Sequence, residues 1–179
     1  MTAETKYGQI RGGHNGFSLH MGANETFYSK SGRFVVNDGF GNGELADEND
    51  TNLQGFVREG QPADGSGAGG FTTHATNEGD SVFWCVIDLT AVFRLPLAFS
   101  ATYDRNYSYA LDGELCDIIV INGVQYVDLS QSNKDNVRIV GGKAASAIFT
   151  DGGVEGLCLG DGYVDVMLVE GKIYAQEIE

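Results

Sequence analysis

The chain has 179 residues, of which 25 are acidic and 11 are basic, so it carries a net charge of −14. A surface with this charge repels phosphate groups, which argues against a nucleic-acid-binding protein. The sequence contains no run of roughly 18 apolar residues, so we expect neither a membrane-spanning helix nor a membrane as partner.

Residues 1–24 are rich in glycine and predict an extended, flexible N-terminal arm. Residues 1–33 hold four basic and two acidic residues, a net charge of +2, which leaves −16 on the remainder. A slightly basic arm on an acidic body is suited to docking on another surface. A merely flexible chain start explains the same pattern, and the sequence does not separate the two.

Residues 25–59 predict a small β unit, with strand-like runs at 33–37 (RFVVN) and 53–58 (LQGFVR). Between them, residues 47–52 (DENDTN) offer several oxygen ligands. An EF-hand calcium loop would need Gly and Glu where this chain has Asn52 and Arg58, so that loop is excluded. A solvated acidic turn is the simpler interpretation, and a calcium ion in an irregular loop stays open.

Residues 60–79 form a connector rich in Gly, Ser and Thr. Its Gly65–Gly70 stretch satisfies the G-x-G-x-x-G pattern, but a dinucleotide site also needs a strand before it and a helix after it. Neither is predicted here. We therefore interpret the segment as a linker and expect no cofactor.

Residues 80–179 predict the main β domain, a barrel or sandwich, and helix signals are nearly absent. Asn122-Gly123 between two β-branched runs predicts a tight hairpin. The alternation across residues 93–99 predicts a strand with one buried face, and Pro96 places that strand at a sheet edge or bulge. Further strand-like runs are SVFWCVIDL (81–89), VRIV (137–140) and YVDVMLV (163–169), the last followed by a possible turn at Glu170-Gly171.

The sequence offers little catalytic chemistry. His14, His20 and His74 lie in Gly-rich segments without a neighbouring metal ligand, and no G-x-S-x-G motif is present. We therefore expect no enzyme and no metal site. Cys85, Cys116 and Cys158 sit in apolar contexts and are expected to be buried thiols.

Aromatic residues suggest binding rather than catalysis. Trp84 lies within an apolar run, which favours core packing over a sugar-binding platform. Tyr103, Tyr107 and Tyr109 follow the 93–99 strand and are better candidates for a protein interface.

Several segments together resemble the β-barrel of the decoration proteins on tailed-bacteriophage heads. The segments that carry the resemblance are Phe93-Arg94-Leu95-Pro96, Gly113 with Asp117-Ile118, Arg138-Ile139-Val140 and Val164 to Val166. Residues 27–59 also resemble a β unit of phage capsid-associated proteins. The Gly-rich first 24 residues and the 60–79 connector depart from the pattern.

The resemblance implies a virion structural protein, assembled in the host cytoplasm. It would bind the major capsid protein on the outside of an assembled head, often as a trimer, without catalytic residues. Alternatives are another virion component (minor capsid, head fibre base or tail protein) or a carbohydrate-binding β module, which would need an exposed Trp84. The capsid-contact candidates are Lys6, Tyr7, Arg11, Phe17, Arg33 and Phe34, and the candidates for contacts between copies are Phe93, Arg94, Leu95, Tyr103, Tyr107 and Tyr109.

Overall fold

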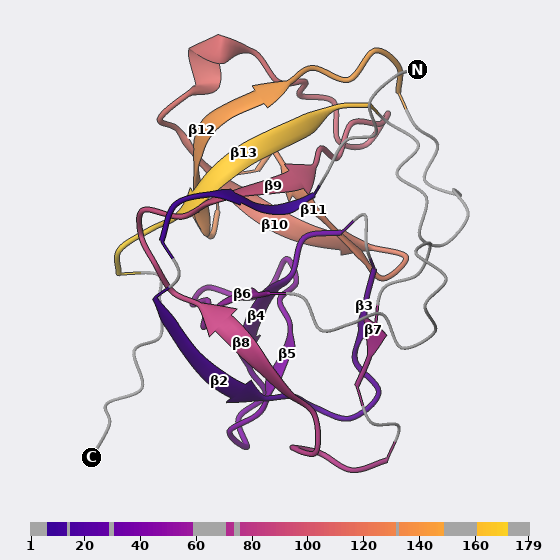
Figure 1. The fold of residues 1–179 in the computed structure, drawn as a ribbon. Coiled ribbons are helices and arrows are strands. Elements are labelled where there is room, and N and C mark those ends of the chain that lie inside the picture. Colours follow the sequence, from indigo (N-terminus) through magenta and orange to yellow (C-terminus); the bar gives the residue numbers. More distant parts are fainter. Residues whose placement is uncertain are drawn as a thin grey trace, which may run out of the picture.

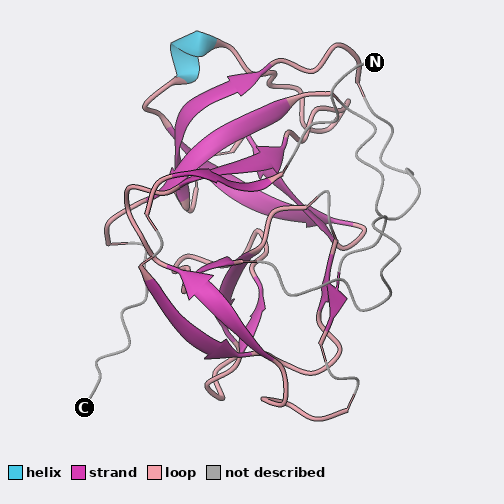
Figure 2. Cartoon of the chain, in the orientation of Figure 1, coloured by secondary structure: helices cyan, strands magenta, loops and turns pink. Residues whose placement is uncertain are grey.

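The computed structural model describes residues 7–13, 15–28, 31–58, 71–73, 76–131, 133–148 and 161–171. The regular secondary structure of these residues is almost entirely β-strand, as the sequence predicted, with one short 3-10 helix, η1 (Tyr109–Leu111), and long connecting loops (Figure 2). The strands are β1 (Gly8–Arg11), β2 (Gly16–His20), β3 (Thr26–Phe27), β4 (Phe34–Asn37), β5 (Gly43–Leu45), β6 (Gly55–Val57), β7 (Phe71–Thr72), β8 (Val82–Val86), β9 (Val92–Pro96), β10 (Leu115–Ile121), β11 (Val124–Asp128), β12 (Val137–Lys143) and β13 (Tyr163–Leu168).

Two larger sheets pack together in a sandwich-like arrangement (Figure 1). The six-stranded sheet has the order β1-β9-β13-β12-β10-β11, and the five-stranded sheet has the order β2-β8-β6-β4-β5. Strands β3 and β7 form a separate ribbon. All pairs between these strands are antiparallel.

The hairpin predicted at Asn122-Gly123 is confirmed. Ile121 pairs with Val124 across the turn, and the two turn residues have φ values of 51° and 77°. Asn and Gly are the residues that adopt this left-handed conformation most readily. The turn fixes the register of β10 on β11, and this register determines the position of Gln125.

The N-terminal segment differs from the flexible arm that the sequence predicted. Strand β1 pairs with β9 in the six-stranded sheet, and β2 pairs with β8 in the five-stranded sheet. The glycines between these strands allow close packing rather than freedom of movement. A Cβ atom at Gly12, whose φ is 100°, would overlap the backbone of Thr90 and Ala91. Residues 8–20 are therefore part of the fold and connect its two sheets.

The predicted boundary at residue 80 is also not a boundary between folded units. Strand β8 lies in the five-stranded sheet and pairs with β6 from the predicted small unit. The main core combines residues from both predicted units, including Phe34, Phe56 and Phe93. The rings of Phe56 and Phe93 stack with centroids 4.5 Å apart, and Phe34 meets both edge-on.

Strand β9 lies inside its sheet, between β1 and β13, so the edge position inferred from Pro96 is wrong. Pro96 is the last residue of β9, and the pairing with β1 reaches only as far as Arg94. The missing N–H of Pro96 therefore lies beyond the part of β9 that β1 pairs with.

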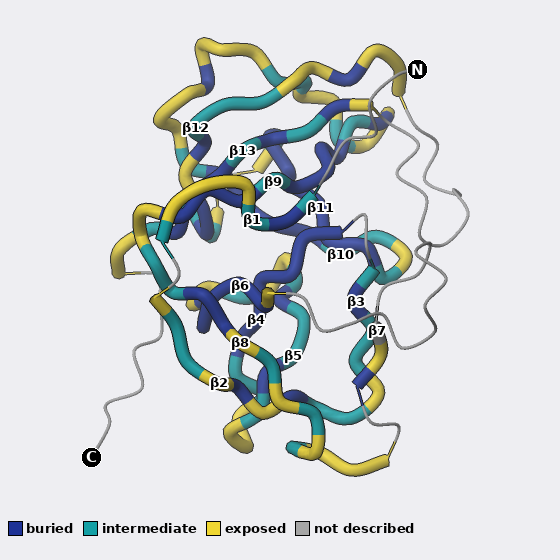
Figure 3. Tube along the Cα trace, viewed as in Figure 1, coloured by how far each residue is buried: buried dark blue, intermediate teal, exposed yellow. Residues whose placement is uncertain are grey.

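The five-stranded sheet contributes to a core on each of its faces, while β2 and the start of β8 stay partly exposed (Figure 3). One face packs on the six-stranded sheet, and the other carries a smaller core that includes Leu19, Val35 and Cys85. A parallel bridge between Met21 and Gly43 links the two outer strands, β2 and β5, so this sheet curls around the smaller core.

A buried glutamine joins the two sheets. Gln125 on β11 accepts a hydrogen bond from the Phe34 N–H through Oε1, at 2.9 Å. Its Nε2 donates to the carbonyls of Phe34 and Ala46, at 3.0 and 2.8 Å. These bonds fix the start of β4. At this point of the chain, the adjacent residues Arg33 and Phe34 lie in different environments.

Candidate functional site

A cleft of about 420 Å³ lies between β1 and β6. Its volume lies within the range of roughly 300–1,000 Å³ that is usual for ligand sites. Strand β1 borders the six-stranded sheet, and β6 lies across from it in the five-stranded sheet (Figure 1). We call this hollow the arginine cleft. Its described lining residues are Tyr7, Gly8, Gln9, Ile10, Arg11, Gly12, Arg33, Phe56 and Arg58.

Charge sets the arginine cleft apart from the rest of the molecule. Three of the chain's six arginines line it, and none of the described lining residues is Asp or Glu. The guanidinium group stays protonated at all physiological pH values. A concentration of positive charge therefore lies on a chain whose net charge is −14.

The other three arginines are engaged elsewhere. Arg94 forms a two-pronged ion pair with Asp165, with N–O distances of 2.7 and 2.8 Å. Arg105 pairs with Glu114 at 3.0 Å, and Arg138 donates to the Gly113 carbonyl at 2.7 Å. Their positions make Arg105 and Arg138 useful controls for the cleft arginines.

The backbone of each cleft arginine is held by a neighbouring strand. Arg11 pairs with Val92 of β9. The Arg33 carbonyl accepts a hydrogen bond from the Val57 N–H at 2.9 Å, and the Arg58 N–H donates to the Trp84 carbonyl at 2.8 Å. Arg33 and Arg58 also interact with other parts of the chain. Both sheets thus contribute arginines with a fixed backbone position to one hollow.

The cleft also offers apolar contact area. Phe56 is fully buried and lies at the junction of the cleft and the aromatic core. The Ile10 side chain on the opposite wall is 41% exposed. Beside Arg58, the Trp84 side chain is 42% exposed. Arginine together with exposed tryptophan is the combination that is enriched in protein–protein interfaces.

The structure brings three of the predicted capsid-contact residues together, because Tyr7, Arg11 and Arg33 all line the cleft. The prediction of Phe34 as a capsid contact needs a correction, because its side chain is fully buried in the main core and is unavailable to a partner. Phe17 is half-buried against the smaller core, and Lys6 lies outside the described residues.

Sequence reasoning missed Arg58. The residue follows β6, where a strand ends and its side chain reaches solvent. The signal available in the sequence was the positive charge of Arg58, because the whole chain has only 11 basic residues and this one follows an apolar strand. The sequence could not show that Arg58 lines the same cleft as Arg11, which is far away along the chain.

The predicted contacts between copies need a similar correction. Phe93 and Leu95 are fully buried, because β9 points both side chains into the main core. Tyr103 packs partly against a small outer cluster, whereas Tyr109 is 86% exposed. Only the outward-facing members of the predicted set can meet a partner.

Arg94 and Tyr107 are both partly buried, and Tyr107 packs against the margin of the main core. The Arg94 guanidinium lies 3.8 Å from the ring centroid of Tyr163. The Tyr107 hydroxyl donates to Asp112 at 2.9 Å, and partial burial together with this bond raises the pKa of Tyr107 to about 12. Both side chains are therefore held in place on a partly exposed surface.

The structure also contradicts the expected burial of Trp84, since this side chain is exposed on β8. Strand β8 alternates, with Cys85 in the smaller core and Val86 in the main core. Trp84 lies two residues before Val86 and therefore on the same face of β8, but it stays exposed. Cys85 and Cys116 are buried free thiols as predicted, and burial raises the pKa of Cys85 to about 12. Cys158 lies outside the described residues.

Within the described ranges, no group of three or more His, Cys, Asp or Glu side chains could hold a metal ion. In the 47–52 run, Asp47 and Asp50 use carboxylate oxygens to accept backbone N–H groups of the same turn. His20 lies 2.7 Å from the Gly79 carbonyl, whereas His14 and His74 are outside the described residues.

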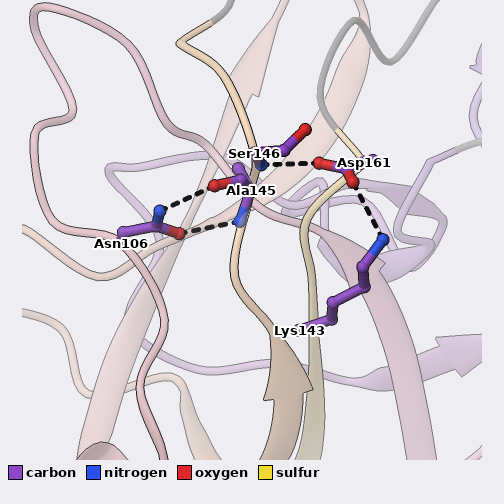
Figure 4. Close-up of polar contacts among 5 residues, drawn as sticks. All are labelled: Asn106, Lys143, Ala145, Ser146 and Asp161. Carbon is purple, nitrogen blue, oxygen red and sulfur yellow. Dashed lines mark hydrogen bonds and ion pairs between the residues drawn. The ribbon is translucent and has the colours of Figure 1, made fainter.

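A second polar cluster fastens the end of β12 to the segment before β13 (Figure 4). Asp161 binds Lys143 at 2.9 Å and accepts the Ser146 N–H at 2.7 Å, which holds the pKa of Asp161 well below its usual range. Asn106 bonds to both the N–H and the carbonyl of Ala145. These contacts join loops and leave no oxygen arranged around an open site, so we assign the cluster a structural role.

Comparison of the chain with protein-family models, curated proteins and solved structures finds no match to any of them. No helix in the described residues is long and apolar enough to cross a membrane.

Proposed function

We propose that this chain is a non-catalytic virion structural protein that docks on the outer surface of an assembled phage head and stabilises it. The observation that carries the docking part of the proposal is the arginine cleft, a fixed cationic hollow with apolar rims on an acidic body. The head-decoration part rests on the sequence resemblance. The major capsid protein is the proposed partner.

The composition of the cleft supports binding rather than catalysis. None of its described lining residues is a His, Cys, Ser, Thr, Asp, Glu or Lys. General acid–base or nucleophilic catalysis usually relies on one of these groups. Arginine, glutamine, tyrosine and exposed aliphatic groups instead suit recognition of a surface.

Lattice binding agrees with the proportions of the cleft. A cleft of about 420 Å³ provides a modest contact for one copy. Many copies bound to one shell, or copies joined in a trimer, would gain affinity through multivalency. The strongly acidic remainder of the surface would limit adhesion between particles.

The direct test is co-sedimentation with empty capsids assembled from the major capsid protein of the same virus. We expect saturable binding at a fixed ratio to the capsid lattice. Residues 8–20 form strands in both sheets, so deletion of residues 1–24 would disrupt the fold. Point variants are therefore required: Arg11→Ala with Arg58→Ala should weaken binding.

The matched control is Arg105→Ala with Arg138→Ala, which removes the same charge from exposed positions away from the described cleft lining. We expect this control pair to bind capsids like the wild type. Absence of binding by the wild-type protein would contradict the proposal.

Exposed Trp84 favours a second candidate, a carbohydrate-binding β module. Its ring is 42% exposed and lies on β8, opposite Ser18 of β2. Sugar rings stack on exposed aromatic faces of this kind. Affinity electrophoresis in gels containing cell-surface polysaccharide tests this candidate, which requires retardation of the wild type and its loss in Trp84→Ala.

We also propose that copies of the chain meet through exposed Tyr109 of η1, with the partly exposed Arg94 and Tyr107 as further candidates. Sedimentation velocity measures the oligomeric state directly. A trimer that Tyr109→Ala dissociates would support the proposal, and a monomer at all accessible concentrations would contradict it.

A further inference from the structure

We infer that the arginine cleft binds an extended, acidic segment of a protein partner, in which carboxylate side chains alternate with apolar ones. This inference deepens the proposed docking function and rests on it for the identity of the partner. The argument uses the charge of the cleft, the shape of its β1 wall and the charge of the surrounding surface.

Charge selects carboxylates. Arg11 and Arg58 are exposed on opposite walls, and Arg33, which precedes β4, lines the cleft as a buried residue. A guanidinium group binds a carboxylate through two parallel hydrogen bonds, which makes arginine well suited to Asp and Glu side chains. The exposed Arg11 and Arg58, one on each wall, can bind carboxylates from both sides of one ligand, and the buried Arg33 adds positive charge behind them.

The shape of the cleft selects an extended segment. The six consecutive residues from Tyr7 to Gly12 form one wall, so the wall has the length of a whole strand. Among the described strands, β1 is the terminal member of its sheet and pairs only with β9. A strand in this position can bind an extended chain along its open side through backbone hydrogen bonds.

Apolar groups argue against a free inorganic anion as the ligand. Ile10 lies on the β1 wall, and Trp84 lies next to Arg58 on the other side. Each has about two fifths of its surface exposed. A segment with alternating side chains would place carboxylates on the arginines and apolar groups on these two residues.

The acidic body argues against nucleic acid. A nucleic-acid strand carries one negative charge on every nucleotide, and it would extend beyond the cleft on both sides. Outside the cleft it would meet a surface that gives the chain its net charge of −14. A short acidic segment can lie entirely within the positively charged cleft and so avoids the acidic surface around it.

The test is a titration of the full-length protein with a short synthetic peptide in which Glu alternates with Val. Fluorescence of Trp84 is the readout, because it is the chain's single tryptophan and its carbonyl is bonded to Arg58. Isothermal calorimetry detects binding that leaves the fluorescence unchanged. The matched ligand is the same peptide with Gln in place of Glu.

We expect the Glu peptide to bind and the Gln peptide to bind at least about tenfold more weakly, because the arginines would lose their charged partners. Arg11→Ala and Arg58→Ala should each weaken the Glu peptide about tenfold, whereas Arg105→Ala and Arg138→Ala should not. Added salt should weaken binding to the wild type.

Equal binding of the two peptides, equal losses in the control variants, or preference of the cleft for a single-stranded oligonucleotide would each overturn the inference. Failure of the docking function is distinguishable from this outcome. A protein that binds the Glu peptide in the cleft but does not sediment with capsids keeps the inference and loses the capsid as partner. Capsid binding that Arg11→Ala and Arg58→Ala leave unchanged, together with equal binding of the Glu and Gln peptides, overturns the inference and keeps the docking function.

Discussion

The two sides of the interface between the sheets are built in opposite ways. On the closed side, Gln125 crosses from β11 to β4 and its amide group makes three buried hydrogen bonds. On the open side, β1 and β6 separate and the arginine cleft lies between them. Adjacent residues serve the two sides, because Phe34 is bonded to Gln125 while Arg33 lines the cleft.

The comparison shows that the backbone at a cleft residue can be held through its neighbour along the chain. The start of β4 is held through the Phe34 backbone and the aromatic core. Arg33 therefore has a defined position although its side chain faces a cleft. If this view is correct, substitutions on the closed side should affect stability strongly, and those on the open side should affect binding.

Phe93→Ala should give the largest effect on stability. The Phe93 ring is fully buried and contacts both Phe34 and Phe56. Removal of a buried phenylalanine ring leaves a cavity and costs about 3–5 kcal/mol of unfolding free energy. Urea unfolding measures the loss, and Phe93→Leu, which keeps most of the volume, should lose far less. A loss below about 1 kcal/mol would show that the two sheets do not depend on this contact.

The next largest effect is expected for Gln125→Met. Methionine keeps most of the volume but leaves the Phe34 N–H and the Ala46 carbonyl without this buried partner, while the Phe34 carbonyl keeps its bond from the Ala46 N–H. Each unsatisfied buried group costs about 1–3 kcal/mol, so we expect a loss of roughly 2–4 kcal/mol in urea unfolding.

The matched control for Gln125 is Gln54→Met. Gln54 is equally buried, but its amide group has no hydrogen-bond partner among the described residues. Replacing it with methionine should therefore be neutral or stabilising. Equal losses in the two variants would mean that the Gln125 bonds do not hold the closed side together.

A smaller effect concerns pH and Asp128 on β11. Its side chain is buried opposite Asp117, and burial raises the pKa of the Asp128 carboxyl above its ordinary value. A raised pKa means that the carboxyl favours the fold at pH values below its unfolded pKa of about 4 and loses this contribution as the pH rises through the folded pKa.

Asp128→Asn should therefore lose less stability than the wild type as the pH rises from about 4 toward neutrality. Urea midpoints across this pH range measure the difference between the two proteins. Exposed Asp104→Asn serves as the control and should follow the wild type. Parallel curves for Asp128→Asn and the wild type would contradict a raised pKa at this site.

The same contrast explains how much of the molecule the sequence could predict. Local signals worked where one segment determines its own conformation, as at the Asn122-Gly123 hairpin. They failed where distant segments meet. The glycines of residues 8–20 indicated flexibility. In the structure, Gly12 instead lets the chain pass close to the backbone of Ala91. Pro96 indicated an edge because the sequence did not reveal where β1 stops along β9.

The candidate site shows the same limit. The basic residues Arg11 and Arg33 were identified from charge alone, because positive side chains are scarce in this chain. Phe34, Phe93 and Leu95 were assigned to surfaces although alternation along their strands places them in the core. The place of Arg58 in the cleft and the exposure of Trp84 beside it depend on the pairing of β6 with β8, which the sequence does not reveal.

The smallest effect on stability is expected on the open side, for Arg11→Ala. The Arg11 side chain is exposed and shares the cleft with Arg33 and Arg58, which carry the same charge. Its removal relieves like-charge repulsion, so the unfolding free energy should change by less than about 0.5 kcal/mol, or rise slightly at low salt. Urea unfolding at low and high salt measures this change. A loss of several kcal/mol would make Arg11 part of the scaffold, and the division between a closed, stabilising side and an open, binding side would then fail.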